Sequence, residues 1–204
     1  MNQSVYGHIA QQHHAVGILK LATGTLNNEI GLFRERVRYY QPFAFGAVRD
    51  HNLKLYKQLL DIYFTVPYTS FSVFYHEKSY SLGQLIANSL NKQENMVVFV
   101  SSQYHNSAHR YSEEDTREMV KRKMRRDALF GIHPVSIRDS SELQMAQVLL
   151  GIVSHAVSLL DTDPITKNAK FRLVKHLQRH LNTDKLARTN EYYLRFKRRF
   201  AVEL

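Results

Sequence analysis

The sequence predicts an α/β protein in which helices pack on a mixed β-sheet. Short apolar or alternating runs, typical of strands, take turns along the chain with segments whose apolar residues recur at helical spacing. The most apolar of the short runs, residues 96–100, is typical of a parallel strand buried on both faces. The length of 204 residues, 44% of them hydrophobic, favours one compact domain with a helical appendage over two full domains.

The first elements are two strands and a helix. The apolar or alternating segments 4–10 and 15–22 predict strands, and the second is broken by Thr23-Gly24-Thr25. After this break, apolar residues recur at helical spacing to about Tyr39, and Pro42 ends that helix.

The middle of the chain repeats the alternation of helix and strand. Residues 52–64 carry leucines and tyrosines on one helical face, and Pro67 closes the helix. A short strand over 71–75 follows, then a helix over 82–90 and a strand over 95–101. We expect the last of these to be the central, parallel strand.

Caps and charges mark the elements that follow. Ser112 precedes three acidic residues, and the helix that begins there ends in the basic run 121–126, so its charges suit both helix ends. Residues 130–137 predict a strand, whose proline indicates a sheet edge. Ser141-Glu142-Leu143-Gln144 reads as a capping box that opens a long, buried, apolar helix through Leu160.

Two helices are predicted for the end of the chain, one over 165–181 after Asp163-Pro164 and a basic one over 185–199. Locally paired strands followed by alternating strands and helices are the layering expected of a ribonuclease-H-like α/β domain. We expect this domain over residues 1–162, with a basic helical extension over residues 163–204 packed on it.

The composition excludes several classes of protein. The absence of cysteine excludes a disulfide framework and thiolate metal sites, and it fits a reducing cytosol. The sequence contains neither a long apolar run nor a signal-peptide pattern at Met1-Asn2-Gln3-Ser4. We therefore expect a soluble cytoplasmic protein without a membrane partner.

The charge points to a polyanionic partner. Lysine and arginine number 28 against 18 acidic residues, a net charge of +10. Nucleic acid or an acidic protein surface would suit such a balance. Two basic clusters are candidate nucleic-acid contacts, although either can also be a solvated helix surface: Lys121, Arg122, Lys123, Arg125 and Arg126, and Arg195, Lys197, Arg198 and Arg199. The second cluster is interleaved with aromatic residues, which suits stacking on bases.

Three stretches resemble a family of proteins with a ribonuclease-H-like fold. They are Leu53 to Phe64 with the strand after it, Met96 to Ser102, and Asp139 to Gln147 with its leucine-glutamine-x-alanine pattern. The family is the uncharacterised domain of unknown function 3800. The resemblance implies carboxylates on the first strand, at the end of the central strand and on the closing helix. Such carboxylates would hold divalent ions for phosphodiester cleavage.

Every one of these acidic positions is neutral in this chain. Residues 1–25 contain no aspartate or glutamate, the central strand ends at Ser101, and Gln147 stands where the closing helix would carry aspartate. Neutral side chains are poor ligands for magnesium. The sequence therefore predicts no catalytic residues, with Ser101 and Gln147 as degenerate positions.

Histidines supply the alternative metal site. His105 and His109 are four residues apart after the central strand, and His76 follows a neighbouring strand. Such a set can bind a borderline metal, or it can consist of ordinary surface residues. The glycines form no phosphate-binding loop, so no nucleotide cofactor is expected.

Three hypotheses of different classes follow. The leading one is a non-catalytic nucleic-acid-binding protein with a degenerate ribonuclease-H-like fold, a subunit of a larger bacterial or mobile-element assembly. The second is a metal-dependent nuclease that uses the histidines. The third is a protein-interaction scaffold whose basic tail docks on an acidic partner.

Overall fold

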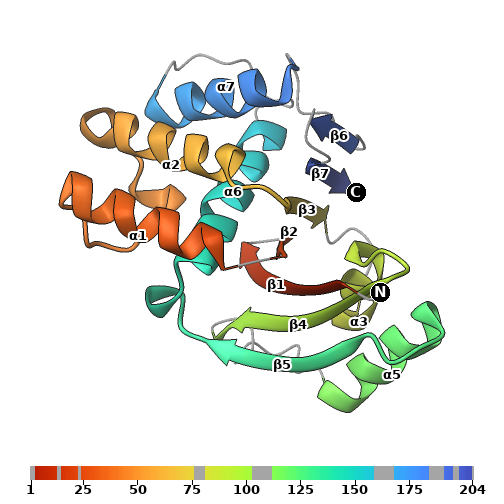
Figure 1. Ribbon diagram of the computed structural model, residues 1–204. Coiled ribbons are helices and arrows are strands. Elements are labelled where there is room, and N and C mark those ends of the chain that lie inside the picture. Colours follow the sequence, from red (N-terminus) through yellow and green to blue (C-terminus); the bar gives the residue numbers. More distant parts are fainter. Residues whose placement is uncertain are drawn as a thin grey trace.

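A mixed β-sheet forms the centre of the computed structural model, which describes residues 3–12, 15–22, 24–75, 81–102, 112–158, 168–183, 191–194 and 198–203. In the described residues the sheet has seven strands in the order β5-β4-β1-β2-β3-β7-β6 (Figure 1). The strands are β1 (Gln3–Gln12), β2 (Ala15–Leu21), β3 (Thr69–Tyr75), β4 (Glu94–Ser101), β5 (Leu129–Val135), β6 (Glu191–Leu194) and β7 (Arg198–Glu203).

The first five strands have the topology of a ribonuclease-H-like fold. β2 runs antiparallel to both β1 and β3, whereas β4 runs parallel to both β1 and β5. The spatial order β3-β2-β1-β4-β5 is therefore that of a hairpin meander extended by two parallel strands. The fold class predicted from the sequence is confirmed, including a buried, parallel β4 and β5 at the sheet edge.

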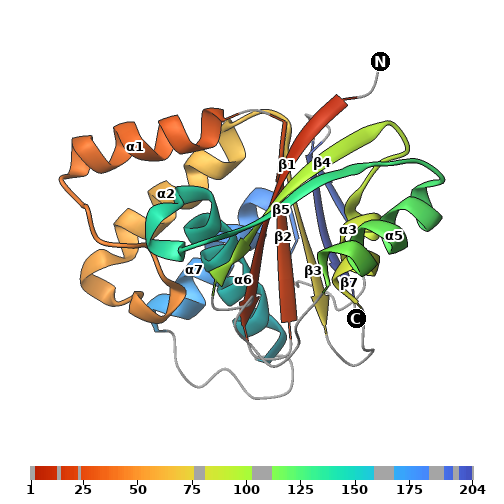
Figure 2. The same cartoon turned by 90° about the horizontal axis from the view of Figure 1, so that it is seen from below.

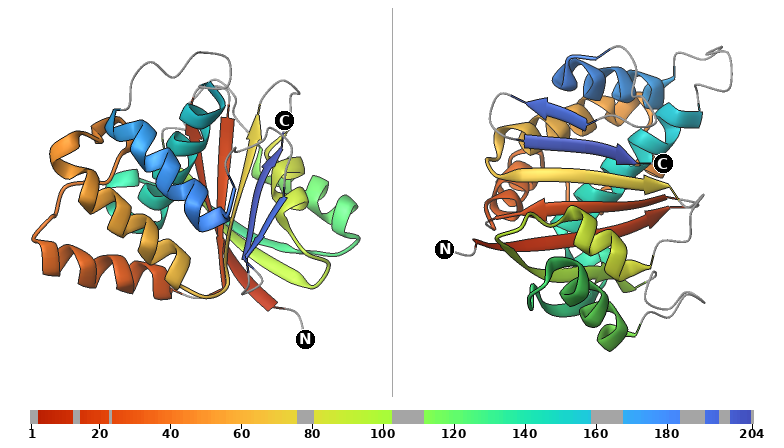
Figure 3. Two further views of the ribbon diagram at one scale, coloured as in Figure 1. Left: turned by 90° about the horizontal axis from the view of Figure 1, so that it is seen from above. Right: turned by 90° about the vertical axis from the view of Figure 1, so that its right-hand side faces the viewer.

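Helices cover both faces of the sheet (Figures 2 and 3). One face packs against α1 (Thr25–Val37), α2 (Leu53–Thr65), α6 (Ser141–Ser158) and α7 (Ala169–Leu181), and the other against α3 (Leu82–Ser89) and α5 (Glu113–Met124). Each face has its own apolar core cluster, because the inner strands alternate buried side chains between the two faces. None of the described helices is both long enough and apolar enough to cross a membrane.

The apolar helix α6 is the element that lies closest to the sheet. Residues on nearly every side of this helix are buried, as predicted. A methyl group at Gly17 of β2 would lie 2.7 Å from the Phe71 ring and 3.3 Å from Cβ of Leu150 on α6. The absence of a side chain at Gly17 thus lets strand, ring and helix approach one another.

The start of α6 differs from the predicted capping box. The hydroxyl of Ser140, not that of Ser141, accepts the hydrogen bond from the Leu143 backbone N–H at 3.1 Å. The Gln144 side chain is occupied elsewhere: its oxygen accepts from the Phe43 backbone N–H at 2.8 Å, and its amide donates to the Ile137 carbonyl at 2.9 Å. Gln144 therefore joins three chain segments instead of closing a cap.

The end of the chain corrects two predictions. α7 begins at Ala169 instead of 165, because the Asn168 side chain accepts from the Phe171 N–H at 2.9 Å and so caps the helix there. The predicted helix over 185–199 is wrong for the described residues 191–194 and 198–199, which are strand residues: β6 and β7 pair with each other, and β7 pairs with β3. Aromatic residues are frequent there and favour strands, and an open edge of β3 offers backbone partners.

Candidate functional site

The sheet face under α6 is where the resemblance places catalytic carboxylates. β1 and β4 are adjacent and parallel, with His8 paired to Phe99, and α6 packs against both strands. Ser101 is buried at the end of β4, and Gln147 is half-buried on α6. The structure thus brings the first strand, the central strand and the closing helix together, as the fold class requires, with neutral side chains at Ser101 and Gln147.

An open pocket of about 400 Å³ lies on this sheet face. Tyr6 and His8 of β1 and Phe99 of β4 form its floor, and Asp139 and Glu142 line it from the start of α6. We call it the sheet-face pocket. Its two carboxylates come from the short 3-10 helix Ile137–Asp139 and from the first turn of α6, not from the strands.

His8 is the chemically distinctive residue of the sheet-face pocket. Its ring stacks on Phe99 with centroids 5.0 Å apart, and burial lowers the pKa of His8 from 6.5 to about 4. The imidazole is therefore neutral at pH 7. Its Nδ1 has no hydrogen-bond partner among the described residues. A neutral ring offers one lone pair and no negative charge, which does not replace a carboxylate pair in holding magnesium.

The histidines predicted as an alternative metal site, His76, His105 and His109, lie outside the described residues. Within the described ranges, the one group of three potential metal ligands consists of Asp61, His176 and His180. The sheet-face pocket contributes none of them.

The first predicted basic cluster lies at the end of α5, and its charges are largely compensated. Lys121 pairs with Asp127 at 3.1 Å, and Arg122 pairs with Glu118 one turn earlier. Lys123 donates to the Asn88 side chain. From residue 113 to residue 127 there are six basic and five acidic residues. This helix therefore presents little net charge to a polyanion.

Arg126 has a structural role. Its guanidinium donates to the carbonyl of Lys92 at 3.1 Å, to the carbonyl of Glu94 and to the side chain of Asn95. Three hydrogen bonds hold the turn before β4 against the residues that follow α5. Arg126 is thus committed to the fold and is half-buried, whereas Arg125 is exposed.

The second predicted basic cluster is not helical at its two described residues. Arg198 and Arg199 are consecutive residues of β7 and pair with β6, while Arg195 and Lys197 lie outside the described residues. A helix would gather residues three or four apart on one side, and a strand spaces them differently. The predicted helical conformation of this cluster is therefore wrong for residues 198 and 199.

A cationic row that the sequence reading did not single out lies on α7. Arg172, Lys175 and Arg179 are exposed at spacings of three and four residues, and the helix contains no acidic residue. The opposite side of α7 buries apolar residues, among them Leu173 and Leu177. We call Arg172, Lys175 and Arg179 the α7 cationic face.

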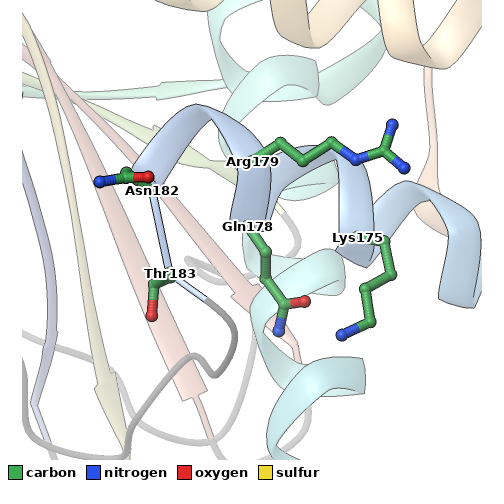
Figure 4. A pocket seen from close by; sticks show the side chains of 5 residues that line it. All are labelled: Lys175, Gln178, Arg179, Asn182 and Thr183. Atoms are coloured by element: carbon green, nitrogen blue, oxygen red, sulfur yellow. The ribbon is translucent and has the colours of Figure 1, made fainter.

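An open, mainly polar pocket of about 340 Å³ adjoins the end of this face. Lys175, Gln178 and Arg179 line it together with Asn182 and Thr183, and Figure 4 shows Lys175 and Gln178 extending to the same side of the helix. Gln178 is buried, and its side-chain oxygen has no hydrogen-bond partner among the described residues.

Comparison with known proteins adds no name to this geometry, since neither a protein-family model nor a curated protein matches the chain. The sheet topology supports a ribonuclease-H-like fold and points to no particular family. Two signals could have identified the additional residues from the sequence. His8 lies two residues from Tyr6 on an alternating strand, and His176 and His180 are four residues apart on a helix.

Proposed function

We propose that this protein binds nucleic acid through the α7 cationic face and the adjoining pocket, and that its ribonuclease-H-like domain has no nuclease activity. The observation that carries the proposal is the row Arg172, Lys175 and Arg179 on a helix without acidic residues. Of the three, only Arg172 has an acidic partner among the described residues, the exposed Asp50. Lys175 and Arg179, which have no acidic partner among the described residues, would gain most from a partner that carries closely spaced anions.

The geometry of the row suits a phosphate backbone. A helix rises about 1.5 Å per residue, so Arg172 and Arg179 lie about 10 Å apart along the axis. One strand of a duplex presents a phosphate about every 3.4 Å of its own axis, so the row can reach about three phosphates. Gln178 and Asn182 supply neutral polar groups beside the cations. These contacts recognise a backbone and not a base sequence.

The absence of catalysis rests on the sheet face. The chain resembles the domain of unknown function 3800 in its order of elements, and we propose that it is a degenerate relative that serves as a subunit of a larger assembly. Ser101, Gln147 and the neutral His8 supply no carboxylate from the strands or the middle of α6. The two carboxylates of the sheet-face pocket, Asp139 and Glu142, come from the 3-10 helix before α6 and from the first turn of α6, so divalent ions would lack the strand-borne carboxylates that the resemblance implies.

Two experiments test this function. The purified chain should bind single- or double-stranded DNA or RNA at low ionic strength, with an affinity that falls steeply as salt rises. Salt-insensitive binding, or no binding, would contradict the nucleic-acid proposal and favour the third hypothesis, a scaffold for an acidic protein. With magnesium or manganese the chain should leave the same nucleic acids intact. Cleavage that disappears in His105→Ala/His109→Ala would establish the nuclease hypothesis instead.

A further inference from the structure

The seam between α2 and α7 contains a cluster of metal-ligand side chains. Nε2 of His176 and Nε2 of His180 both contact the same oxygen of Asp61, at 2.6 and 2.7 Å. The potential ligand atoms of the three residues all lie within 4.8 Å of one another. Two imidazoles from α7 and one carboxylate from α2 thus meet between the two neighbouring helices.

The surrounding structure fixes these rings before any ligand arrives. A spacing of four residues puts both imidazoles on one side of α7, and their planes meet at 86°. Phe64 of α2 stacks on His180 with centroids 4.2 Å apart. At the other end of the seam, Arg172 pairs with Asp50. The two helices are therefore held together independently of Asp61.

The electrostatics of the cluster favour an ionised carboxylate. Although partial burial opposes ionisation, the hydrogen bonds from His180 and His176 outweigh it and hold the pKa of Asp61 below its ordinary value. The side chains of His176, His180 and Asp61 are 19%, 30% and 46% exposed. A cation arriving from solvent would therefore meet a charged oxygen ligand at an accessible site.

We propose that Asp61, His176 and His180 bind zinc or a similar borderline divalent metal and so clamp α7 to α2. Two imidazole nitrogens and one carboxylate oxygen are a ligand set that zinc accepts, with solvent available for the fourth position. Zinc holds such ligands about 2.0 to 2.2 Å away at tetrahedral angles, which separates neighbouring ligand atoms by about 3.3 Å. The two imidazole–carboxylate contacts would have to lengthen by about 0.6 Å to reach this separation, and the two imidazole nitrogens already lie within 4.8 Å of each other.

The competing explanation is a purely structural ion-pair cluster, in which protons on the two imidazoles occupy the place of the metal. Both explanations use the same three residues, but only the metal site predicts a binding stoichiometry. They are separated by titrating zinc into the untagged chain after chelation and dialysis, with calorimetry and thermal unfolding as readouts.

We expect one zinc ion per chain, and a folding equilibrium constant that rises about 100-fold at a free zinc concentration 100 times the dissociation constant. His176→Gln/His180→Gln should abolish both effects, and Asp61→Asn should weaken binding by at least about tenfold. Cobalt in place of zinc should give the visible absorption of a low-symmetry site in the wild type and lose it in the double variant.

Matched controls keep the assignment specific. His51→Gln/His133→Gln changes two exposed histidines outside the cluster and should leave zinc binding unchanged. His105→Gln/His109→Gln tests the histidine pair of the nuclease hypothesis and should also leave it unchanged. Circular dichroism of the zinc-free variants establishes that they fold. Absence of zinc binding in the wild type, or binding that survives in folded His176→Gln/His180→Gln, would overturn the proposal.

Discussion

The two basic helices α5 and α7 differ in what their cations do. On α5 the acids occupy the first turn and the bases the last, and pairs such as Arg122 with Glu118 neutralise each other. On α7 the cations Lys175 and Arg179 have no acidic partner among the described residues, and the helix contains no acid. A run of basic residues in the sequence therefore predicts a binding surface for anions only where no neighbouring acidic residues neutralise it.

The two helices also differ in how they are held to the rest of the protein. α5 buries two residues, Thr116 and Val120, whereas α7 buries six along its inner side. Helix α5 and the residues after it instead depend on polar contacts, among them those of Arg117 in the helix and Arg126 beyond its end with backbone carbonyls. In α5, cations serve the fold. In α7, apolar residues hold the helix and leave the cations available.

The largest expected effect tests this difference in packing. Leu177→Ala should lower the free energy of unfolding by about 3 kcal/mol, because Leu177 is fully buried between α7 and the rest of the core. Val120→Ala removes less buried volume from α5 and should cost about 2 kcal/mol. Urea unfolding measures both. If Leu177→Ala did not lower the free energy of unfolding, the claim that buried apolar residues hold α7 in place would be contradicted.

A cation from each helix region gives the next effect. Arg126→Gln should cost about 2 kcal/mol, since three hydrogen bonds from a charged group hold the turn before β4. Arg179→Gln should change stability by less than about 0.5 kcal/mol, because Arg179 is exposed and unpaired in the described part of the chain. Urea unfolding measures both free-energy changes. If the two variants lowered the free energy of unfolding equally, the distinction between a cation that stabilises the fold and one that is free to bind a partner would be contradicted.

The smallest effect concerns an acid on the α5 side of the sheet. Although burial opposes ionisation, hydrogen bonds from the Asn91 backbone and from Lys20 hold the pKa of Glu94 below its ordinary value. A lowered folded-state pKa stabilises the protein above the unfolded-state value, and that stability is lost as the pH falls through the folded-state value. Glu94→Gln should therefore cost about 1 kcal/mol at pH 6.

The same cost should shrink as the pH is lowered from 6 to 3, when Glu94 itself becomes protonated. Asp61→Asn at the α7 seam should follow the same sign with a smaller amplitude, because the Asp61 side chain is 46% exposed against 10% for Glu94. Urea unfolding at several pH values provides the measurement. A cost of Glu94→Gln that does not depend on pH would show that the carboxylate charge is irrelevant there.

Sequence periodicity predicted the elements through α6 well, because strand alternation and helix spacing are local properties. The 96–100 run became the buried strand β4, and the proline-containing run after α5 became the edge strand β5. A helix was wrongly predicted for residues 191–194 and 198–199, because clustered cations and apolar residues are compatible with a helix as well as with a strand. Only the open edge of β3, a tertiary feature, decides between the two.

The candidate sites were less predictable, since each depends on elements far apart in the chain. Asp61 meets His176 and His180 across more than 100 residues, so neither helix alone signals a metal-ligand set. His8 acquires its lowered pKa from burial against Phe99, which the strand order produces. The net charge of each basic helix is local and could have been compared from the sequence.

The central claim is that α7, and not α5, meets a polyanion. Its most direct test is the salt dependence of nucleic-acid affinity in the wild type and two variants of equal charge, Arg172→Gln/Lys175→Gln/Arg179→Gln and Lys121→Gln/Arg122→Gln/Arg125→Gln. Each contact contributes about −0.7 to −0.9 to the log–log slope, so the α7 variant should flatten it by up to about 2 to 3 units. The α5 variant should change the slope by less than about 1 unit. Equal flattening in both variants, or flattening in the α5 variant alone, would contradict the account.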